Sequence, residues 1–344
     1  MKILVTGGCG FLGSHVCSVF RSKGWDVVAY DNLTKYELER TGYRVDASRR
    51  HNVDFLESIG VTIAVEDVRD AATLLRHAEG ADFIAHTAAQ PAMTISWENP
   101  RLDLETNVVG TFNVLEAARA SRIPVASCST IHTYGTGIND EIREDGTRYV
   151  REPAAIPESQ PTLTGMLTPL HASKYAGEVY VRTYIETFGV KAAAFRYTGI
   201  YGPRQFGAED HGWAANFVIR NLTGRPIRIF GTGKQTRDIL FASDAAQAFW
   251  NYAQNPVPGV YNVGGGPANA ISLLESIQLI ESLTGRPSQV VHEAERHGDL
   301  RYFVADIEQA RRAFGFEPVL RPREGLSQLV EWAKANLDVF ALPA

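Results

Sequence analysis

The sequence predicts an α/β fold, built on a doubly wound parallel sheet and completed by a smaller C-terminal lobe. Short apolar runs alternate with helical patterns, a glycine-rich turn follows the first run, and an acidic residue closes the second. Such alternation is typical of a parallel sheet with helices on both faces. The expected strands are Lys2 to Thr6, Asp26 to Tyr30, Thr62 to Val65, Phe83 to His86, Val125 to Ser129 and Ala192 to Tyr197.

The first strand leads into a turn with glycines at a spacing of three, Gly7, Gly10 and Gly13. Gly7 and Gly10 allow a tight turn and close approach of a ligand to the backbone, and Gly13 lets the next helix pack on the strand. That helix begins at Phe11 and Leu12, and its free N–H groups point at a pyrophosphate. Glycine-rich turns are common in α/β proteins, so the motif needs support from its context.

The second strand supplies that support, because it ends in Asp31 and Asn32, with Asp31 eighteen residues after Gly13. A carboxylate at this place accepts hydrogen bonds from the adenosine ribose of NAD and repels the extra phosphate of NADP. Lys35 is the one nearby cation in the segment that follows. A turn or helix cap is the alternative use of Asp31. The whole pattern predicts a Rossmann dinucleotide site that takes NAD.

The third and fourth strands end in further candidates for cofactor contacts. Asp67 lies where a side chain reaches the adenine ring, although it also suits a cap for the next helix. Small residues after the fourth strand allow the second ribose and the phosphates to lie against the backbone. The expected cofactor-binding residues of this part are Asp67, Val68, Ala88, Ala89, Gln90 and Asn107, the last of which opens a long helix.

Two helices carry apolar stripes that suit pairing with a second copy of the chain. The first stripe consists of Val108, Phe112, Leu115 and Ala118, and the second of Ala176, Tyr180 and Tyr184. A stripe of this kind usually faces the core. Two such helices also fit a four-helix interface between protomers, so we expect a homodimer rather than a monomer.

Composition limits the possible partners and the cellular compartment. With 34 Lys and Arg against 39 Asp and Glu, the net charge of −5 predicts no nucleic-acid and no membrane binding. The chain enters its first strand directly after Met1 and has no long apolar run, so we expect a cytoplasmic protein. Its three cysteines favour neither disulfides nor a metal cluster, and we expect no metal.

Beyond Gly199 the pattern becomes irregular, which suggests a separate lobe. We expect residues 1–198, with a return segment near 236–262, to bind the dinucleotide, and residues 199–235 and 263–344 to bind substrate. A guanidinium fits a diphosphate well, and three arginines in one lobe favour a phosphorylated substrate over isolated surface ion pairs. The expected substrate-binding residues here are Arg204, Gln205, Phe206, Arg237 and Arg301.

Motifs along nearly the whole chain carry a family resemblance. They are TGGCGFLGS, HTAAQ, SCSTIHTYG, ASKYAGE, FRYTGIYGPRQFG and TRDILFASDAAQAF. Together they resemble the extended short-chain dehydrogenase/reductases, and YGPRQFGAEDHGWAANF with EDGTRYV is most similar to the CDP-tyvelose (CDP-paratose) 2-epimerase group. The resemblance implies NAD as cofactor, contacted also by Tyr197 and Thr198, and a nucleotide-diphosphate sugar as substrate.

The resemblance also implies a catalytic set of Ser or Thr, Tyr and Lys, in which Lys lowers the pKa of Tyr and holds the nicotinamide ribose. Thr130 and Lys174 match this set. The tyrosine position, four residues before Lys174, is Leu170, which cannot carry a proton and which we assign to the sugar pocket. Tyr175 is turned about 100° away on the helix and is a poor substitute.

Two histidines are candidates for the missing base, since imidazole titrates near neutral pH without tuning. His132 lies two residues after Thr130 and shares its face if the strand continues, and His171 lies three residues before Lys174 on the same helix face. Packing is the alternative role of each. The sequence therefore favours an epimerase with a non-tyrosine base over a dehydratase or a catalytically silent NAD-binding protein, for which retention of Thr130 and Lys174 has no chemical reason.

Overall fold

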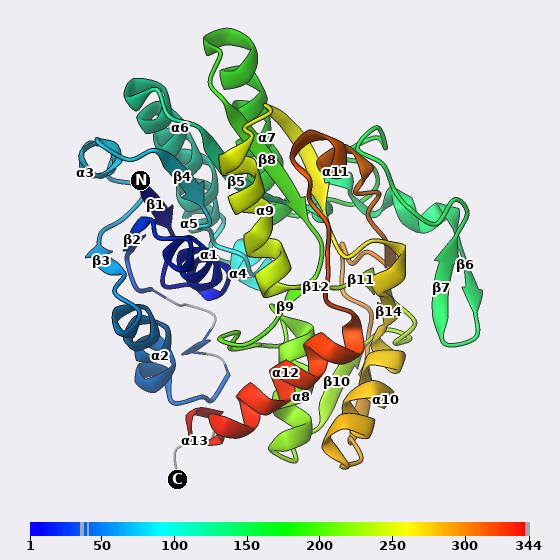
Figure 1. The fold of residues 1–344 in the computed structure, drawn as a ribbon. Coiled ribbons are helices and arrows are strands. Elements are labelled where there is room, and N and C mark those ends of the chain that lie inside the picture. Colours follow the sequence, from blue (N-terminus) through cyan, green and yellow to red (C-terminus); the bar gives the residue numbers. More distant parts are fainter. Residues whose placement is uncertain (35–37, 40, 341–344) are drawn as a thin grey trace.

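A seven-stranded parallel sheet forms the centre of the computed structural model, which describes residues 1–34, 38–39 and 41–340 (Figure 1). The strands lie side by side in the order β3-β2-β1-β4-β5-β8-β13. The chain adds β2 and β3 on one side of β1 and the later strands on the other side, so the strand order reverses between β1 and β4. The strands are β1 (Lys2–Thr6), β2 (Asp26–Asp31), β3 (Thr62–Val65), β4 (Phe83–His86), β5 (Val125–Thr130), β8 (Ala192–Tyr197) and β13 (Gly259–Val263). This arrangement confirms the predicted doubly wound α/β fold.

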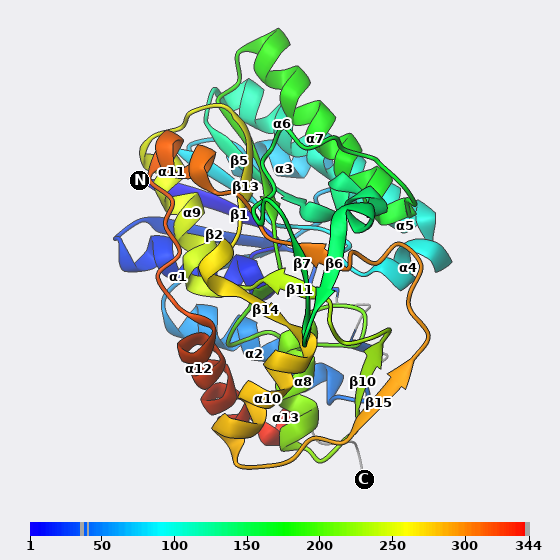
Figure 2. The same cartoon turned by 90° about the vertical axis from the view of Figure 1, so that its right-hand side faces the viewer.

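Helices cover both faces of the sheet (Figure 2). One face packs on α1 (Phe11–Ser22), α2 (Val45–Ser58), α9 (Ala242–Gln254) and α11 (Glu308–Phe314), and the other on α3 (Ala71–Ala78), α6 (Gly110–Ser121) and α7 (Pro169–Phe188). Phe20 of α1 and Phe249 of α9 are fully buried in the first core, and Leu115 of α6 in the second. The central strands are apolar on both faces because both are covered.

The chain between β4 and residue 141 is irregular near the carboxyl ends of the strands. Two short helices, α4 (Met93–Glu98) and α5 (Pro100–Leu104), precede a π-helical turn over Glu105–Val109 and then α6. Asn107 therefore lies inside the π turn and does not open the helix as we expected. Strand β5 is followed by 3₁₀ turns over Ile131–Tyr134 and Thr136–Glu141.

A third core lies below the sheet in Figure 1, around α8 (Trp213–Leu222), α10 (Leu273–Thr284) and α12 (Pro322–Ala335). In the described ranges, three two-stranded sheets, one three-stranded sheet and one further helix complete this part of the chain and its surroundings. Their bounds are β6 (Ile142–Asp145), β7 (Arg148–Arg151), β9 (Ile200–Tyr201), β10 (Ile227–Phe230), β11 (Thr236–Asp238), β12 (Leu240–Phe241), β14 (Ala270–Ser272), β15 (Val290–Glu293), β16 (Tyr302–Phe303) and α13 (Leu337–Phe340). Short strands with long connections explain why the sequence pattern is irregular here.

None of the three cysteines, all of which lie in the described ranges, forms a disulfide: Cys9 and Cys17 are buried and Cys128 is half-buried. Among the helices of the described ranges, none combines the length and the apolar character that crossing a bilayer requires. The predicted cation Lys35 lies outside the described residues.

Candidate functional site

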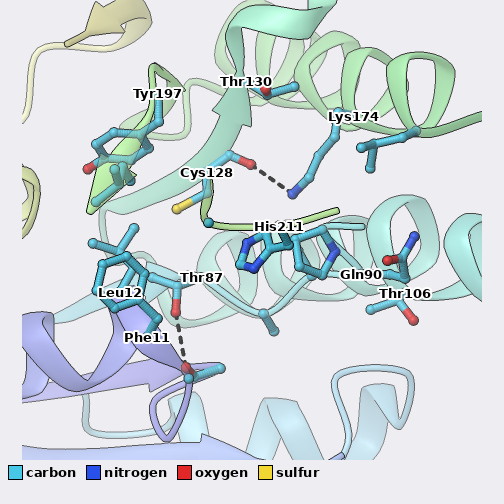
Figure 3. Close-up of a pocket in the computed structure, with 18 of the residues that line it drawn as sticks. Phe11, Leu12, Thr87, Gln90, Thr106, Cys128, Thr130, Lys174, Tyr197 and His211 are labelled. Carbon is cyan, nitrogen blue, oxygen red and sulfur yellow. Dashed lines mark hydrogen bonds between the residues drawn. The ribbon is translucent and has the colours of Figure 1, made fainter. Parts of the chain in front are cut away.

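A cavity of about 460 Å³ lies at the carboxyl ends of the central strands, where the strand order reverses (Figure 3). Ligands of open α/β sheets bind at this kind of place, and the volume is in the range of ligand pockets. Most of the predicted site residues line it. They are Gly7, Gly10, Phe11, Leu12, Asp31, Asn32, Val68, Ala88, Ala89, Gln90, Thr130, His132, Leu170, Lys174, Tyr197, Thr198, Arg204, Gln205 and Phe206.

The glycine loop forms one end of the cavity and has no room for side chains. Gly7 has a φ of +68°, and a Cβ there would lie 2.6 Å from the backbone N of Ala88. A Cβ on Gly13 would lie 2.1 Å from the carbonyl oxygen of Gly7, so Gly13 sits behind the cavity wall and lets the helix approach the turn. The loop thus brings backbone, and not side chains, to the cavity.

Asp31 closes β2 beside this loop and supports it. Its Oδ2 accepts a hydrogen bond from the Cys9 backbone N at 2.9 Å, and its Oδ1 accepts one from the Leu33 N at 2.7 Å. Each carboxylate oxygen has further acceptor capacity. A charged acceptor therefore stands at the cavity wall in a geometry that the backbone holds.

Asp67 is turned toward its neighbours and is absent from the residues that line the cavity, while Val68 lines it. Its carboxylate pairs with Arg69 at 2.7 Å and accepts a hydrogen bond from the Asn32 amide at 2.9 Å. The Arg69 hydrogen bonds lower the pKa of Asp67 to about 2. The helix-cap alternative for Asp67 is wrong, because Asp70 accepts the capping hydrogen bond from Thr73 N at 3.1 Å.

Asn107 lies behind the wall and ties it together. Its Nδ2 donates to the Gln90 carbonyl at 3.0 Å, to Asp103 Oδ1 at 3.0 Å and to Ser173 Oγ at 3.1 Å. The π turn directs this amide inward, a distortion that often occurs at functional sites. The end of β4 is thereby linked to α7, the helix that carries Lys174.

Lys174 reaches the cavity from α7. Its Nζ donates to the carbonyl oxygen of Cys128 at 3.3 Å, and burial lowers its pKa (Figure 3). Leu170, one helical turn earlier and 5% exposed, lines the same cavity. Thr130 ends β5, and its Oγ1 accepts a hydrogen bond from the His132 backbone N at 3.3 Å. The cavity thus holds an ammonium and a hydroxyl, with an isobutyl group on the face where a tyrosine was expected from the resemblance.

The strand does not continue to His132, so the prediction that Thr130 and His132 share a strand face is wrong. A 3₁₀ turn starts at Ile131, since the Thr130 hydroxyl caps it. The His132 ring nevertheless lines the cavity, and burial, His171 and Arg237 lower its pKa to about 3. His171 is buried behind it, with ring centroids 5.2 Å apart, and burial lowers its pKa to about 4.

The three arginines are not brought together. Arg204 lines the cavity, donates from Nε to Ser14 Oγ at 3.0 Å, and lies 4.1 Å over the Phe55 ring. Arg237 is buried and pairs with Asp299 at 3.2 Å, and Arg301 pairs with Glu295 at 2.7 Å. Neither of these two lines the cavity.

Several cavity residues were not anticipated from the sequence. Thr87, within the HTAAQ motif, donates to the Thr6 carbonyl at 2.7 Å. Arg69 adds a cation to the wall, and the ring of His211 projects into the cavity (Figure 3). Asp210, next to His211, pairs with Arg296 at 3.0 Å. Thr87 lies in the HTAAQ motif, and Asp210 and His211 lie in YGPRQFGAEDHGWAANF, so the motifs could have drawn attention to these three but not to Arg69.

Comparisons with known proteins show the family of the chain. Residues 3–264 match the model of the family described as "NAD dependent epimerase/dehydratase family". A CDP-paratose 2-epimerase of Salmonella typhi is 34% identical, over 97% of this chain and 100% of its own. Among solved structures, a UDP-glucose 4-epimerase of Thermus thermophilus in complex with NAD is 29% identical, with a TM-score of 0.80 over 97% of this chain and 99% of its own. A UDP-glucose 4-epimerase of Thermotoga maritima with UDP-glucose is 27% identical, with a TM-score of 0.81 over 98% and 100%.

Proposed function

The chain belongs to the NAD-dependent epimerase/dehydratase family, and from that premise we propose that it is a nucleotide-sugar epimerase, similar to CDP-tyvelose 2-epimerase, with a base other than tyrosine. One observation carries the proposal: a single cavity joins the glycine loop and Asp31 to Lys174, Thr130 and Leu170. The similarity to the CDP-paratose 2-epimerase, at 34% over the whole length, supports the choice of substrate class.

The residues of the cavity fit NAD. The side-chain-free turn at Gly7 and Gly10 suits a pyrophosphate, and the carboxylate of Asp31 suits the adenosine ribose diol. Lys174 is in a position to hold the second ribose. When bound, NAD supplies a nicotinamide ring that can take a hydride from a sugar carbon and return it to the opposite face. The protein's task is to hold the sugar, to manage the hydroxyl proton and to keep water out.

The nucleotide diphosphate is assigned to the arginines and to the segment that follows β9. None of the carboxylates in the described ranges pairs with Arg204, so its charge is available to a ligand. Arg237 forms an ion pair with Asp299, and Arg301 forms one with Glu295. A diphosphate would have to displace these carboxylates from the two guanidinium groups. We retain the division into residues 1–198 with a return segment near 236–262, and a lobe of 199–235 and 263–344, as part of this proposal.

Leu170 is the feature that separates this proposal from the mechanism implied by the resemblance. A leucine holds no proton, so its contribution is to shape the sugar pocket beside Lys174. Thr130 can bind the reacting oxygen through its hydroxyl. Proton transfer then needs another group, and His132 on the cavity wall and His171 behind it are the candidates.

The test is to incubate the purified protein with CDP-, UDP- and GDP-sugars and to analyse the products by mass spectrometry and NMR. An epimerase gives a product of unchanged mass and altered ring couplings. A product lighter by one water would identify a dehydratase, and no product with any sugar would support a catalytically silent NAD-binding protein. The nucleotide released on denaturation checks the cofactor, since NADP in place of NAD would contradict the role of Asp31.

A homodimer and a cytoplasmic location complete the proposal. Of the two predicted stripes, Leu115, Ala118 and Tyr184 are buried in the core, whereas Phe112 and Tyr180 are exposed. These two form an exposed apolar surface with Val109 and Val179, which we call the α6–α7 face, with 39–42% of each residue accessible. The rings of Phe112 and Tyr180 lie 5.8 Å apart across the two helices. A face of this kind supports pairing with a second copy.

A further inference from the structure

Lys174 brings an amine into the cavity without a carboxylate to pair with. Its Nζ donates to the Cys128 carbonyl oxygen at 3.3 Å (Figure 3), and within the described ranges it forms no other hydrogen bond and no ion pair. An ammonium has three N–H donors. A single acceptor leaves two of them to water or to a ligand, so the protein satisfies the charged form of Lys174 poorly.

The groups around Nζ do not replace the missing carboxylate. Asp103 of α5 is the carboxyl group whose charge acts on Lys174, but its Oδ1 already accepts hydrogen bonds from Gln90 Nε2 at 2.9 Å and Asn107 Nδ2 at 3.0 Å. Burial raises the pKa of Asp103 and raises that of the Cys128 thiol to about 12. Both groups therefore hold their protons more tightly than usual and offer less negative charge.

These surroundings favour the uncharged amine. Burial lowers the pKa of Lys174, and His86 of β4 adds no negative charge, since burial and Lys174 lower the pKa of that imidazole to about 3. The Lys174 side chain is half-buried and lines the cavity, so ligands there would remove more of its water and disfavour the charge further. A lysine in such a place can serve as a general base.

The other candidate groups of this region are weaker bases. Burial is the main cause that lowers the pKa of His132 to about 3 and that of His171 to about 4. A base is most efficient when its pKa lies near the working pH, and these imidazoles are far below neutrality. Tyr197 lines the cavity, but its hydroxyl donates to the Ala245 carbonyl at 2.9 Å and burial raises its pKa.

Lys174 is also placed beside the position from which the tyrosine is missing. Leu170 and Lys174 are four residues apart on α7, so they share a helix face, and both line the cavity. The leucine ends in two methyl groups, so no protein hydroxyl at this position stands between the amine and a sugar. The Cys128 carbonyl that holds Nζ is two residues before Thr130, so the amine and the Thr130 hydroxyl belong to the same end of β5.

We propose that Lys174 is itself the general base of the reaction, and that its Nζ takes the hydroxyl proton of the sugar directly. The role rests on the proposed function, because it needs a sugar and NAD in the cavity. A neutral amine keeps two hydrogens, one for the Cys128 carbonyl and one for the ribose, and it offers its lone pair to the sugar hydroxyl.

The step balances with the groups that the proposed function supplies. In the oxidation the C–H and O–H bonds of the sugar break and a C=O bond forms, the hydride leaves with its electron pair for NAD, and the proton goes to Nζ. The Lys174 ammonium returns the same proton when the ketone is reduced on its other face. The Thr130 hydroxyl holds the reacting oxygen in both directions.

Two substitutions separate a base from a group that only holds the ribose. Arginine keeps the charge and the donors but cannot lose its proton, so Lys174→Arg is expected to lower kcat about 100- to 10,000-fold, as much as Lys174→Met. Lys191→Arg, at an exposed position before β8, is the matched control and should change neither kcat nor KM. A kcat of Lys174→Arg within tenfold of wild type would overturn the proposal.

Added amines distinguish a lost base from a distorted site. Lys174→Ala leaves space for a small amine, and its kcat is expected to rise in proportion to the concentration of uncharged methylamine when the pH is varied at constant total amine. A residue that only positions the cofactor by its charge would instead respond to methylammonium. A rate that is independent of the uncharged amine would contradict the role of Lys174 as base.

The amine can also be titrated without any turnover. In NMR spectra of the protein with ¹³C-labelled lysine, the Cε signal lost in Lys174→Arg identifies the residue, and its midpoint is expected below the ordinary lysine value of about 10.4. A midpoint at or above that value would contradict the inference. If the wild type converts a sugar while His132→Gln or His211→Gln, and not Lys174→Arg, loses 100-fold in kcat, the proposed function stands and the inference fails. If the wild type converts no sugar, the proposed function itself has failed, and the base role with it.

Discussion

At the scale of single residues, Leu170 is the position where a small change tests the chemistry most directly. Its side chain is 5% exposed, faces the cavity and lies one helical turn before Lys174. An apolar wall beside an ammonium can select the sugar face without taking part in proton transfer. Its neighbours Thr130 and Lys174 carry the polar contacts.

Leu170→Ala is expected to alter KM or the choice of sugar while kcat changes little, because the substitution widens the pocket and removes no proton carrier. Removal of a buried leucine side chain also costs about 2 to 5 kcal/mol of stability. Steady-state kinetics and thermal unfolding measure both effects, and Leu170→Met, with nearly conserved volume, is the control. A drop in kcat of two orders of magnitude at constant KM would show that this position takes part in the chemistry.

Residue identity could be predicted where chemistry needs one residue type at a fixed spacing. The glycines of the first turn and Asp31 meet this condition, because their task is local to one βα unit. The partners of Arg237 and Arg301 could not be predicted, since Asp299 and Glu295 come from distant or irregular segments. His211 likewise stands in a loop whose course depends on the finished fold.

At the scale of elements, α7 links the sheet to the site. Glu178 of α7 and Arg196 of β8 form a buried ion pair, with Nε to Oε2 at 2.9 Å and side chains 0% and 6% exposed. Arg196 Nη1 also donates to the Tyr134 hydroxyl at 2.8 Å. The helix that presents Lys174 is therefore held to the strand by charge as well as by packing.

Glu178→Ala is expected to destabilise the fold by about 3 to 5 kcal/mol, because it leaves the Arg196 guanidinium buried without its carboxylate. Urea unfolding measures the loss. Glu331→Ala is the control, since the exposed Glu331–Lys334 pair of α12 should contribute less than about 1 kcal/mol. Equal effects of the two substitutions would show that burial does not strengthen the Glu178 pair.

The α6–α7 face makes a prediction about assembly. Phe112→Asp places a charge in the proposed interface and is expected to convert a dimer into a 37.8 kDa monomer that still binds NAD. Light scattering after gel filtration measures the mass. Val319→Asp, at a residue 73% exposed in the segment before α12, should leave the dimer intact. If the wild-type protein is itself a monomer, the α6–α7 face is not a dimer interface.

Element types were more predictable than element ends. Apolar runs and turn residues predicted six strands, four of them with the observed bounds. The π turn at Asn107 and the 3₁₀ turn after Thr130 were missed. Asn107 donates to Ser173, which folding brings in from α7, whereas the 3₁₀ turn has a local hydrogen bond from the His132 N to the Thr130 hydroxyl. Asn107 consequently does not open a helix, and His132 does not share a strand face with Thr130, as the sequence analysis had expected.

At the scale of the whole molecule, buried histidines control the pH dependence of stability. Burial lowers the pKa of His15, His86 and His132 to about 3, and that of His171 to about 4. An unfolded histidine takes up its proton near pH 6.5. The stability that these four contribute is present above that pH and is lost as the pH falls toward their folded values. Asp238 acts in the opposite direction, since burial raises its pKa to about 7.

The four histidines leave the unfolded chain with more bound protons than the folded protein between pH 6 and 4.5. Asp238 offsets part of this difference, and so do Asp103, Glu158, Asp244 and Asp299, because burial raises the pKa of each of these carboxyl groups. Urea unfolding at pH 7.5, 6.0 and 5.0 is expected to show a loss of stability with acidification. Stability that stays constant or increases over this range would mean that these imidazoles are charged in the folded protein.

The late position of β13 has a consequence for biosynthesis. The sheet accepts its seventh strand from residues 259–263, and α9, which covers α1, comes from residues 242–254. A nascent chain that has left the ribosome only as far as β8 has the whole glycine loop but exposes the β8 edge and the apolar surface around Phe20. The central sheet is therefore complete only when the chain has been translated as far as β13, and until then its edge needs protection from edge-to-edge association.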